Sequence, residues 1–586
     1  MDQLARIGRG AVREPVAGKK RPAQRLRLVA PSNIASPSYR MQIGQRRFGM
    51  SMHCRDMTVS AEQEPVTSRS PPPYGDIEGQ TQVYTRKSAV ELPRGRLYLV
   101  FYFGLENKFA LTRTRITRRQ LLRQAGATGA LALSASGLAA GEALQDRPAA
   151  ASNAASAAPK TESQAAEKYA HPPGVFINRP LTQVSRMAEA LLDDMEGRNC
   201  DFFFNEASPR SGLVRDRAPT VGRSLSRVAS IAATGFGLSA LCIAAKYNYL
   251  RPMDCEQRVE KTLAFLLEEC PHEHGFLYHF IDVDSGQRLF GSELSSIDTA
   301  ILLCGVLHCR QFFTGNTRIE ALATTFYRRI DWLWMMNGGN TLSMGWLPDQ
   351  GFLKNRWHIY SELTTMYLLA IGSPTHPVPA EAWDAVQRPV VTYGGIDYIS
   401  GAAPLFIHQY PQAWCDYRNQ RDRHANYFTN SIAATRAHQL WCLVQGQKYP
   451  WIDQDMWGIS ASDSRQGYRV WGGPPSIGPL DGTLVPCAAA GSLVFLPAEC
   501  SHVLLTMRER FGDKLYGRYG FADAFQPKAG WYGEDVIGID VGIGMLMAEN
   551  LRSGFVWDCF MKNREIAHAM REVAFHPDPD ANTQVL

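Results

Sequence analysis

Long apolar segments with helical spacing recur between residues 225 and 571. In 231–241 apolar or small residues cover most faces of the helix, which is typical of burial on both sides. The predicted helices are Leu225–Tyr247, Cys255–Cys270, Ser295–Phe313, Arg318–Met336, Glu362–Ile371, Ala380–Gln387, Ala425–Val444, Ala488–Met507, Val541–Leu551 and Trp557–Arg571. With 586 residues, 45% of them hydrophobic, the chain is long enough for one large core. We therefore expect an all-α fold with few strands.

The connections between these helices are long and rich in Gly, Pro, Trp and Tyr. Two examples are "NGGNTLSMGWLPDQGFLKNRW" (337–357) and "DMWGISASDSRQGYRVWGGPPSIGPLDGT" (455–483). Loops this long inside a compact domain usually carry function. Paired helices with rich loops at one end predict an α/α toroid, whose pocket is lined by loops and helix N-termini. A helical solenoid is the alternative, but no fixed-period repeat supports it.

The N-terminal part of the chain differs in composition from the rest. Residues 1–145 hold 23 Lys and Arg against 10 Asp and Glu; since the whole chain has a net charge of +6, the remainder carries −7. A mildly acidic body lacks the basic footprint of a nucleic-acid-binding protein, so we expect no such partner. Residues 1–110 are rich in Arg, Pro and Ser without a sustained period. We expect this stretch to be disordered and to precede the true translation start.

A twin-arginine export signal is predicted at 111–145. Arg118 and Arg119 are followed by Leu121, a mild Ala/Gly/Leu stretch and small residues at 139–143. A short amphipathic helix is the alternative. The apolar run is shorter than the roughly 18–20 residues of a membrane span, so no stable membrane anchor is expected. An Ala/Ser/Pro linker at 146–170 precedes the folded body, 171–586, and export predicts a periplasmic or secreted protein.

The twelve cysteines are scattered, and no C-x-x-C occurs. Several of them lie in apolar helical runs, which favours core thiols over disulfides. His272-Glu273-His274 is the nearest approach to a metal-binding pattern, but it lies in a Pro-flanked turn, where a solvated loop is favoured. No metal or cofactor is expected.

Two carboxylates stand at the mouth of the apolar helix that begins near Ser295. Ser295 and Asp298 fit the S-x-x-D/E capping pattern, in which the serine accepts an orphan backbone N–H. Capping accounts for Asp298, which is also a substrate-binding candidate. It leaves Glu293, just outside the helix, unexplained.

Several strings of the body together resemble one family. They are "GFLYHFIDVDSGQRLFGSELSSIDTAILLCGVL", "RWHIYSELTTMYLLAIGSPTHPVP", "PLFIHQYPQAWCDYRN", "YFTNSIAATRAHQLWC", "WGISASDSRQGYRVWGGPP", "DGTLVPCAAAGSLVFLP" and "GFADAFQ...WYGEDVIGIDVGIGMLMAENLRSGFVW". In this order, from about residue 181 to 571, they resemble the glycoamylase-like domain proteins that include the bacterial endo-β-1,2-glucanases (glycoside hydrolase family 144). The resemblance implies an (α/α)6 toroid, or six-hairpin barrel. It also implies endo-acting, inverting hydrolysis of β-1,2-glucan to sophorooligosaccharides without a metal.

The resemblance places Glu293, Glu362 and Asp540 in the pocket. Inverting hydrolysis needs a protonated carboxyl at the leaving oxygen and a carboxylate that activates water. Glu362 is predicted to be the acid, because aromatic neighbours and burial would raise its pKa. Asp540 is predicted to be the base, and Glu293 to position water or sugar hydroxyls. The alternatives are a first-turn glutamate favoured by the helix dipole for Glu362 and an N-cap for Asp540.

One string departs from the family pattern. Members often read "IGIDQGP" where this chain reads "IGIDVGIG", so Val541 and Ile543 replace a Gln and a Pro. We expect this change to alter a subsite or the preferred chain length of the substrate.

Loop aromatics are the expected platforms for sugar rings, while polar side chains reach the hydroxyls. The substrate-binding candidates are Asp298, Trp346, Arg356, Trp357, Tyr360, His408, Gln409, Tyr410, Trp414, Asp463, Trp471 and Trp531. A satisfied core histidine is the alternative for His408, and a turn-forming aspartate for Asp463. Trp332 and Trp334 are expected in the core.

The sequence leaves several alternative functions open. A β-1,2-glucan-active enzyme of this kind is expected to be a monomer that takes a linear or cyclic glucan. It is either endo-acting or an exo-acting, sophorose-releasing enzyme or a transglycosylase; a non-catalytic glucan-binding protein is a further alternative. A terpene-cyclase-like barrel is disfavoured, because Asp193-Asp194 does not complete a D-D-x-x-D motif.

Overall fold

The computed structural model describes residues 184–578 in full. It also describes the backbone of seven short strands near the N-terminus. These are β1 (Tyr39–Ile43), β2 (Arg46–His53) and β3 (Asp56–Thr58) in one antiparallel sheet, and the hairpins β4 (Val90–Leu92) with β5 (Arg96–Tyr98) and β6 (Phe103–Leu105) with β7 (Lys108–Ala110). The predicted export signal and linker, 111–170, lie outside the described residues. They stay predictions, as does the expectation for residues 1–110.

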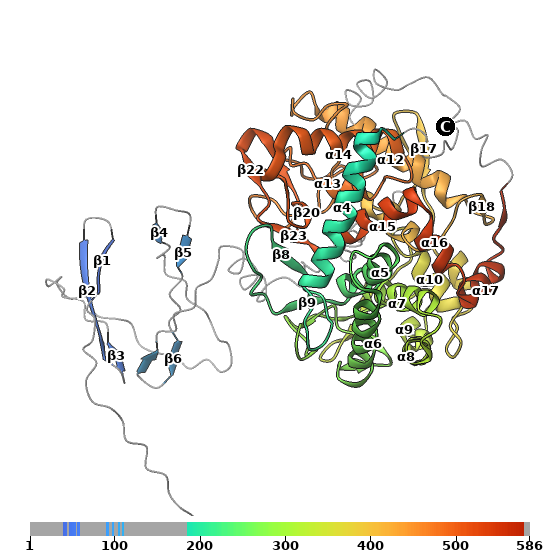
Figure 1. The fold of residues 1–586 in the computed structure, drawn as a ribbon, viewed down its shortest axis with the longest axis horizontal. Coiled ribbons are helices and arrows are strands. Elements are labelled where there is room, and N and C mark those ends of the chain that lie inside the picture. The colour runs from blue at the N-terminus through green and yellow to red at the C-terminus, as the bar shows by residue number, and fades with distance from the viewer. Residues whose placement is uncertain are drawn as a thin grey trace, which may run out of the picture. The chain divides into compact units, whose positions relative to one another are not determined.

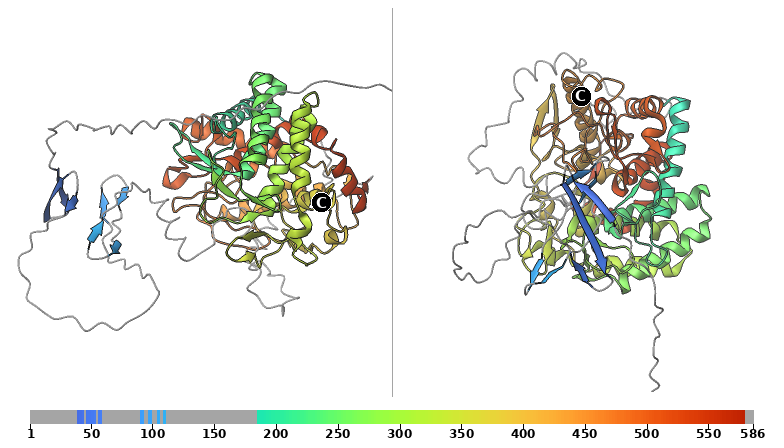
Figure 2. Two further views of the ribbon diagram at one scale, coloured as in Figure 1. Left: turned by 90° about the horizontal axis from the view of Figure 1, so that it is seen from below. Right: turned by 90° about the vertical axis from the view of Figure 1, so that its left-hand side faces the viewer.

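The body, residues 184–578, is built mainly from helices that pack directly on one another (Figures 1 and 2). They are α4 (Arg186–Asn205), α5 (Ile231–Tyr247), α6 (Pro252–Glu268), α7 (Ser296–Phe312), α8 (Thr317–Arg329), α9 (Trp332–Met336), α10 (Thr364–Ile371), α11 (Glu381–Asp384), α12 (Tyr427–Gln445), α13 (Pro486–Ala490), α14 (Pro497–Phe511), α15 (Gly538–Arg552), α16 (Phe555–Phe560) and α17 (Arg564–Glu572).

The helices fall into two kinds. Helices α5, α7, α10, α12 and α15 are buried on nearly every face. Helices α6, α8 and α17 bury one face and expose the other. A helix that is apolar all round needs neighbours on all sides, whereas an amphipathic helix covers a core from outside. Inner helices shielded by outer helices are consistent with an α/α arrangement.

Glycines allow two inner helices to approach closely. Helices α5 and α7 lie side by side (Figure 1). A Cβ on Gly235 would stand 2.5 Å from the backbone oxygen of Ile301, and one on Gly305 would stand 2.1 Å from that of Gly235. Since side-chain carbons do not tolerate such distances, the close crossing requires glycine at both positions.

Most predicted helices are confirmed, and three are divided. The helix predicted at Arg318–Met336 breaks into α8 and α9, because Asp331 caps a new helix by accepting from Trp334 N. The helix predicted at Ala488–Met507 breaks before Pro497, which opens α14. The segment Trp557–Arg571 likewise divides into α16 and α17. Helix α4 was not predicted.

The expectation of few strands is wrong. The body contains β8 (Arg217–Pro219), β9 (Val228–Ser230), β10 (His272–Glu273), β11 (Phe276–Leu277), β12 (Phe280–Asp282), β13 (Leu294–Ser295), β14 (Gly345–Leu347), β15 (Gly351–Phe352), β16 (Val390–Tyr393), β17 (Ile396–Ile399), β18 (Gln420–Arg421), β19 (Tyr516–Gly517), β20 (Gly520–Phe521), β21 (Phe525–Gln526), β22 (Trp531–Tyr532), β23 (Asp535–Ile537) and β24 (His576–Pro577). None exceeds four residues, which is too short to show an alternating pattern in the sequence.

These short strands fix the entrances of the inner helices. Strand β9 leads into α5, β13 into α7, and β23 into α15. Each is held by an antiparallel partner: β9 pairs with β12, β13 with β14, and β23 with β8. The N-termini of three inner helices are thus anchored by backbone hydrogen bonds to other loops.

Among the described residues, every cysteine is free, and all but Cys487 are buried. This agrees with the prediction of core thiols. The turn at 272–274 is exposed, as expected for a solvated loop. A search of the described helices finds none that is both long and apolar enough to cross a membrane.

Candidate active site

A buried histidine lies between two of the predicted carboxylates at the entrance of α7. His279 Nδ1 lies 3.1 Å from Glu293 Oε1, and its Nε2 lies 3.6 Å from Asp298 Oδ1. All three side chains are buried. Ser295 caps the helix as predicted, since its Oγ accepts from Asp298 N and donates to Asp298 Oδ2 at 2.5 Å. Asp298 is therefore both a cap residue and a partner of His279.

The charges of this cluster support one another. Burial alone would lower the pKa of His279, but the charge of Asp298 and the hydrogen bond to Glu293 raise it to about 9. Burial alone would raise the pKa of Glu293, but the bond to His279 lowers it. Burial raises the pKa of Asp298, although His279 opposes the shift. At neutral pH the cluster thus contains an imidazolium facing carboxylates.

Glu362 is the buried carboxyl best suited to carry a proton. It lies two residues before α10 and is 3% exposed, and neither of its oxygens has a hydrogen-bond partner among the described residues. Burial, with a further contribution from the charge of Asp298, raises the pKa of Glu362 to about 8. Since a buried unpaired charge is costly, the neutral form prevails at neutral pH.

An arginine and an aspartate join distant loops on the other side of the site. Arg217 Nη1 lies 3.1 Å from both carboxylate oxygens of Asp463, and its Nε donates to Asp216 at 2.7 Å. The charge of Asp216 also contributes to the raised pKa of His279. Asp216 therefore lies close enough to influence both groups.

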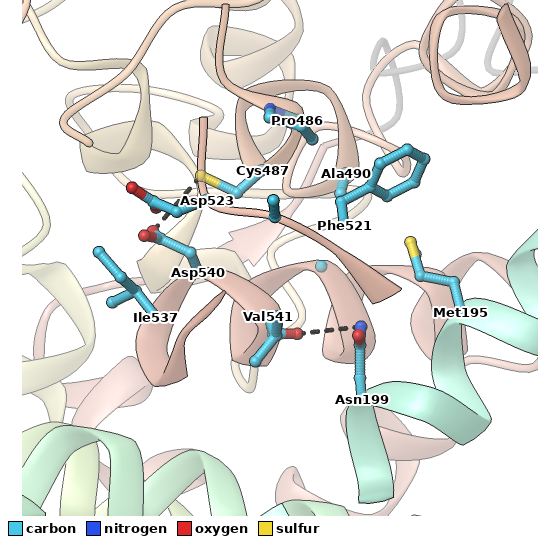
Figure 3. A pocket seen from close by; sticks show the side chains of 12 residues that line it. Met195, Asn199, Pro486, Cys487, Ala490, Phe521, Asp523, Ile537, Asp540 and Val541 are labelled. Atoms are coloured by element: carbon cyan, nitrogen blue, oxygen red, sulfur yellow. Dashed lines mark hydrogen bonds between the residues drawn. The ribbon is translucent and has the colours of Figure 1, made fainter. Parts of the chain in front are cut away.

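Asp540 lies in the first turn of α15, beside a second aspartate and a thiol (Figure 3). Cys487 Sγ donates to Asp540 Oδ1 at 3.4 Å, and Asp523 Oδ2 accepts from the backbone N–H of Asp463 at 2.6 Å. Burial, and then the charge of Asp523, raise the pKa of Asp540. Two buried carboxyls side by side do not both ionise readily, so this pair retains one proton more easily than isolated aspartates do.

Tyr410 is a buried tyrosine whose pKa responds to the charges of both the predicted acid and the predicted base. Its side chain is buried. Burial raises its pKa most, the charge of Asp540 raises it further, and the charge of Glu362 contributes less. One aromatic side chain therefore lies near both Asp540 and Glu362. Each of the three predicted catalytic residues lies at the entrance of an inner helix: Glu293 before α7, Glu362 before α10 and Asp540 in the first turn of α15.

Part of the chain matches a known protein family. Residues 354–564 match the family model Glycoamylase, described as "Putative glucoamylase". The matched range contains Glu362, Tyr410 and Asp540. Over these residues the chain is similar to the glycoamylase-like proteins.

Proteins similar to this chain are named as a glucanase, a glucoamylase and a sophorohydrolase. An endo-β-1,2-glucanase from Chitinophaga pinensis, solved with sophorotriose and glucose, is 27% identical with a TM-score of 0.63, covering 66% of this chain and 98% of that one. A Bacteroides caccae structure named as a glucoamylase is 28% identical with a TM-score of 0.62, covering 67% and 100%. An exo β-1,2-glucooligosaccharide sophorohydrolase from Parabacteroides distasonis is 26% identical over 423 residues, 66% of this chain; the chain spans 58% of that relative's length.

Several of the predicted substrate-binding side chains are engaged inside the protein. The indole N–H groups of Trp357, Trp414 and Trp471 each donate to a buried serine hydroxyl, at 2.9, 2.9 and 3.0 Å. Gln409 Nε2 donates to Ala488 O and to Ser492 Oγ. These contacts favour a packing role for all four side chains over contact with sugar.

Arg356 and Tyr360 are likewise held by the domain itself. Arg356 donates to Thr341 Oγ1, to Met336 O and to Thr341 O, so its guanidinium ties the 337–357 loop together. Tyr360 is buried, and burial raises its pKa to about 12. Substrate binding by Arg356 and Tyr360 remains a prediction. The contacts of Arg356 and the burial of Tyr360 do not favour it.

Four further candidates lie in different surroundings. His408 is buried, and burial lowers its pKa to about 3, which fits the core-histidine alternative. Trp346, in β14, and Trp531, in β22, are half-buried and keep part of their rings exposed. Asp463 is buried against Arg217. Of the loop aromatics, Trp346 and Trp531 thus remain accessible platforms.

The two departures from the family string differ in position. Val541 lines the pocket next to Asp540, whereas Ile543 is fully buried in the core. Of the two positions, only Val541 lies beside Asp540 at a cavity, so the expected effect on a subsite remains a prediction for Val541. Trp332 is fully buried as expected, but Trp334 is half-buried and stacks on His274.

Sequence reasoning missed four residues of the site: His279, Arg217, Asp523 and Cys487. Each of them stands in or beside a string that carried the resemblance, except Arg217. A buried histidine opposite two predicted carboxylates was the one available signal, and it depended on knowing that residues 278 and 279 lie against residues 293 and 294.

His279, Glu293 and Asp298 each offer one donor atom within 4.8 Å of the others. Both ring nitrogens of His279 face carboxylates, so the imidazole already has a partner on each edge. The three side chains therefore form a buried network of ion pairs centred on His279.

Proposed function

We propose that the protein is an exported glycoside hydrolase that cleaves β-1,2-glucan. The observation that carries the proposal is a buried carboxyl, Glu362, without a hydrogen-bond partner among the described residues at the entrance of one inner helix, with the paired carboxyls of Asp540 and Asp523 at the entrance of another. Relatives named for β-1,2-glucan support the choice of substrate. A (α/α)6 toroid, with the site at the N-termini of its inner helices, is the architecture that we propose for the body.

Glu362 acts as the general acid in this proposal. Its proton passes to the glycosidic oxygen as that bond breaks, and burial keeps the carboxyl protonated until then. Asp540 acts as the base: in its ionised form it accepts a proton from water, whose oxygen forms the new bond to the anomeric carbon. Attack from the face opposite the leaving group inverts the anomeric configuration.

The remaining charges position these two groups. His279 holds Glu293 in one orientation, from which Glu293 accepts a hydrogen bond from water or from a sugar hydroxyl. Asp523 shares the charge of Asp540, and Arg217 lowers the cost of that charge. Trp346 and Trp531 serve as platforms for sugar rings further along the glucan.

We propose endo-action to sophorooligosaccharides, with exo-action releasing sophorose as the second candidate. The Chitinophaga relative supports the first and the Parabacteroides relative the second. The twin-arginine signal predicted at 111–145 supports a periplasmic or secreted location.

The experiment that tests this proposal is a time course on linear β-1,2-glucan with product sizes measured by chromatography. Endo-action predicts a ladder of sophorooligosaccharides at early times. Sophorose alone from the first minutes contradicts endo-action but keeps the hydrolase. The anomeric form of the first product, read by NMR, separates inversion from retention.

A further inference from the structure

Asp540 borders a cavity whose lining includes none of Glu293, Asp298 and Glu362. The cavity lies between α4, α13, the segment after β20 and the first turns of α15 (Figure 3). Met195 and Asn199 line one end, and Asp540, Asp523 and Cys487 the other. The cavity therefore reaches Asp540 from the side of α4 and α13.

The end of the cavity formed by α4 carries an unusual polar group. Asn199 is 2% exposed, and its Nδ2 donates to Val541 O at 3.3 Å. Its Oδ1 is buried and has no hydrogen-bond partner among the described residues. An unsatisfied buried acceptor costs about 1–3 kcal/mol, so this atom favours a donor inside the cavity.

The other end offers carboxyl oxygens. Asp540 and Asp523 face the cavity beside the thiol of Cys487, and both are more than nine-tenths buried. Between the two polar ends the wall is apolar, with Ala490 and Phe521 among its residues. The space accommodates water-sized molecules. A buried water is stable where it finds two to four polar partners, and this cavity offers them at both ends.

We propose that this cavity is a water site that supplies the reacting water to Asp540. The inference rests on the proposed role of Asp540 as base. A glucan chain lying across Glu362 and Asp540 covers the site from the front, so water has to be held in place or enter by another side. From the cavity, one water gives its proton to Asp540 while its oxygen bonds to the anomeric carbon and the leaving oxygen takes the proton of Glu362.

The first test is a high-resolution crystal structure of the protein without substrate. The proposal predicts an ordered water that donates to Asn199 Oδ1, in a chain or contact that reaches Asp540. A dry cavity overturns it. This readout does not depend on activity, so it stands apart from failure of the proposed function, which would appear as full glucan hydrolysis by Asp540→Asn.

The second test fills the cavity. Ala490→Val adds two methyl groups to its wall, and Met195→Phe fills it from α4, so one variant remains if the other does not fold. The proposal predicts that kcat on β-1,2-glucan falls about tenfold while KM and the melting temperature are retained. Ala190→Val, on the exposed face of α4, is the matched control and keeps wild-type kcat. An unchanged kcat in a folded variant whose crystal structure shows the water displaced overturns the proposal.

Discussion

The imidazole of His279 lies 3.1 Å from the carboxylate of Glu293, although 14 positions of a turn-rich segment separate the two residues. His279 directly precedes strand β12, and Glu293 directly precedes strand β13. A backbone hydrogen bond from His279 N to Glu293 O, 3.0 Å long, fixes the same pair. The orientation of Glu293 is thus set by both the main chain and the side chain of His279.

Replacing His279 is expected to damage both stability and activity. His279→Gln removes the cation between two buried carboxylates, and breaking such a buried group costs about 3–5 kcal/mol. Glu293 also loses its partner, so we expect kcat to fall about a hundredfold. Thermal unfolding and glucan hydrolysis measure the two effects, and His568→Gln, on an exposed position of α17, is the control.

The pH dependence of this loss has a definite sign. The pKa of His279 is raised to about 9 from an ordinary value of 6.5, so its charge stabilises the fold fully below pH 6.5. This contribution is lost as the pH rises through about 9. The difference in melting temperature between wild type and His279→Gln should therefore shrink between pH 6.5 and about 9 and level off at higher pH; a constant difference over that range contradicts a charged His279.

Asp523→Asn is expected to shift the acidic limb of the pH–rate profile. The charge of Asp523 raises the pKa of Asp540, and its removal lowers the pH at which Asp540 ionises. The rate at low pH, relative to the optimum, should therefore rise. Asp513→Asn, at a highly exposed position, is the control for the change in net charge. A limb that moves to higher pH contradicts the pairing of the two aspartates.

Gly345→Ala is expected to lower activity by displacing Glu293. A Cβ at this position would stand 2.9 Å from Glu293 Cγ and 2.5 Å from the backbone oxygen of Leu294. We expect about a tenfold fall in kcat with a folded protein. Gly315→Ala adds the same methyl group where no atom lies within 4 Å, and it should keep wild-type kinetics. Equal kinetics for both variants would mean that Glu293 tolerates the shift.

Between pH 4.5 and 8 the wild-type protein is expected to lose stability because of Glu196. Glu196→Gln is expected to remove that loss. Glu196 is fully buried beside Glu549, and burial, with the charge of Glu549, raises its pKa from 4.5 to about 8. The native state holds this proton after the unfolded chain has released it, so stability falls over that range and levels off above pH 8. Melting temperatures from pH 4 to 9 should fall less steeply for the variant than for Glu189→Gln, an exposed change on the same helix.

Local patterns in the sequence predicted much of the fold. The cap formed by Ser295 and Asp298 follows from four consecutive residues, and the apolar runs of α5, α7 and α12 locate inner helices because burial on all faces needs no knowledge of the neighbours. Breaks such as Asp331 and Pro497 depend on which cap or proline the packing uses. These signals were present in the sequence but weaker than the apolar periodicity around them.

The site was harder to predict where it depends on contacts between distant segments. Arg217 meets Asp463 across 246 positions, and no local pattern announces such a pair. Trp357 and Trp414 occur in loops, which suggested exposed platforms, yet the loops fold inward and each indole donates to a buried serine. Aromatic content predicts contact area, but tertiary packing decides whether the contact is with sugar or with protein.

The central claim is that Glu362 supplies the proton for cleavage of β-1,2-glucan. Its most direct test is reducing-end release from linear β-1,2-glucan, beside laminarin, cellulose and starch, by wild type and Glu362→Gln across pH 5–9. The account predicts activity on β-1,2-glucan alone, lost as the pH rises through about 8, where the Glu362 carboxyl ionises, and nearly abolished in the variant. Undiminished hydrolysis by a folded Glu362→Gln would contradict it.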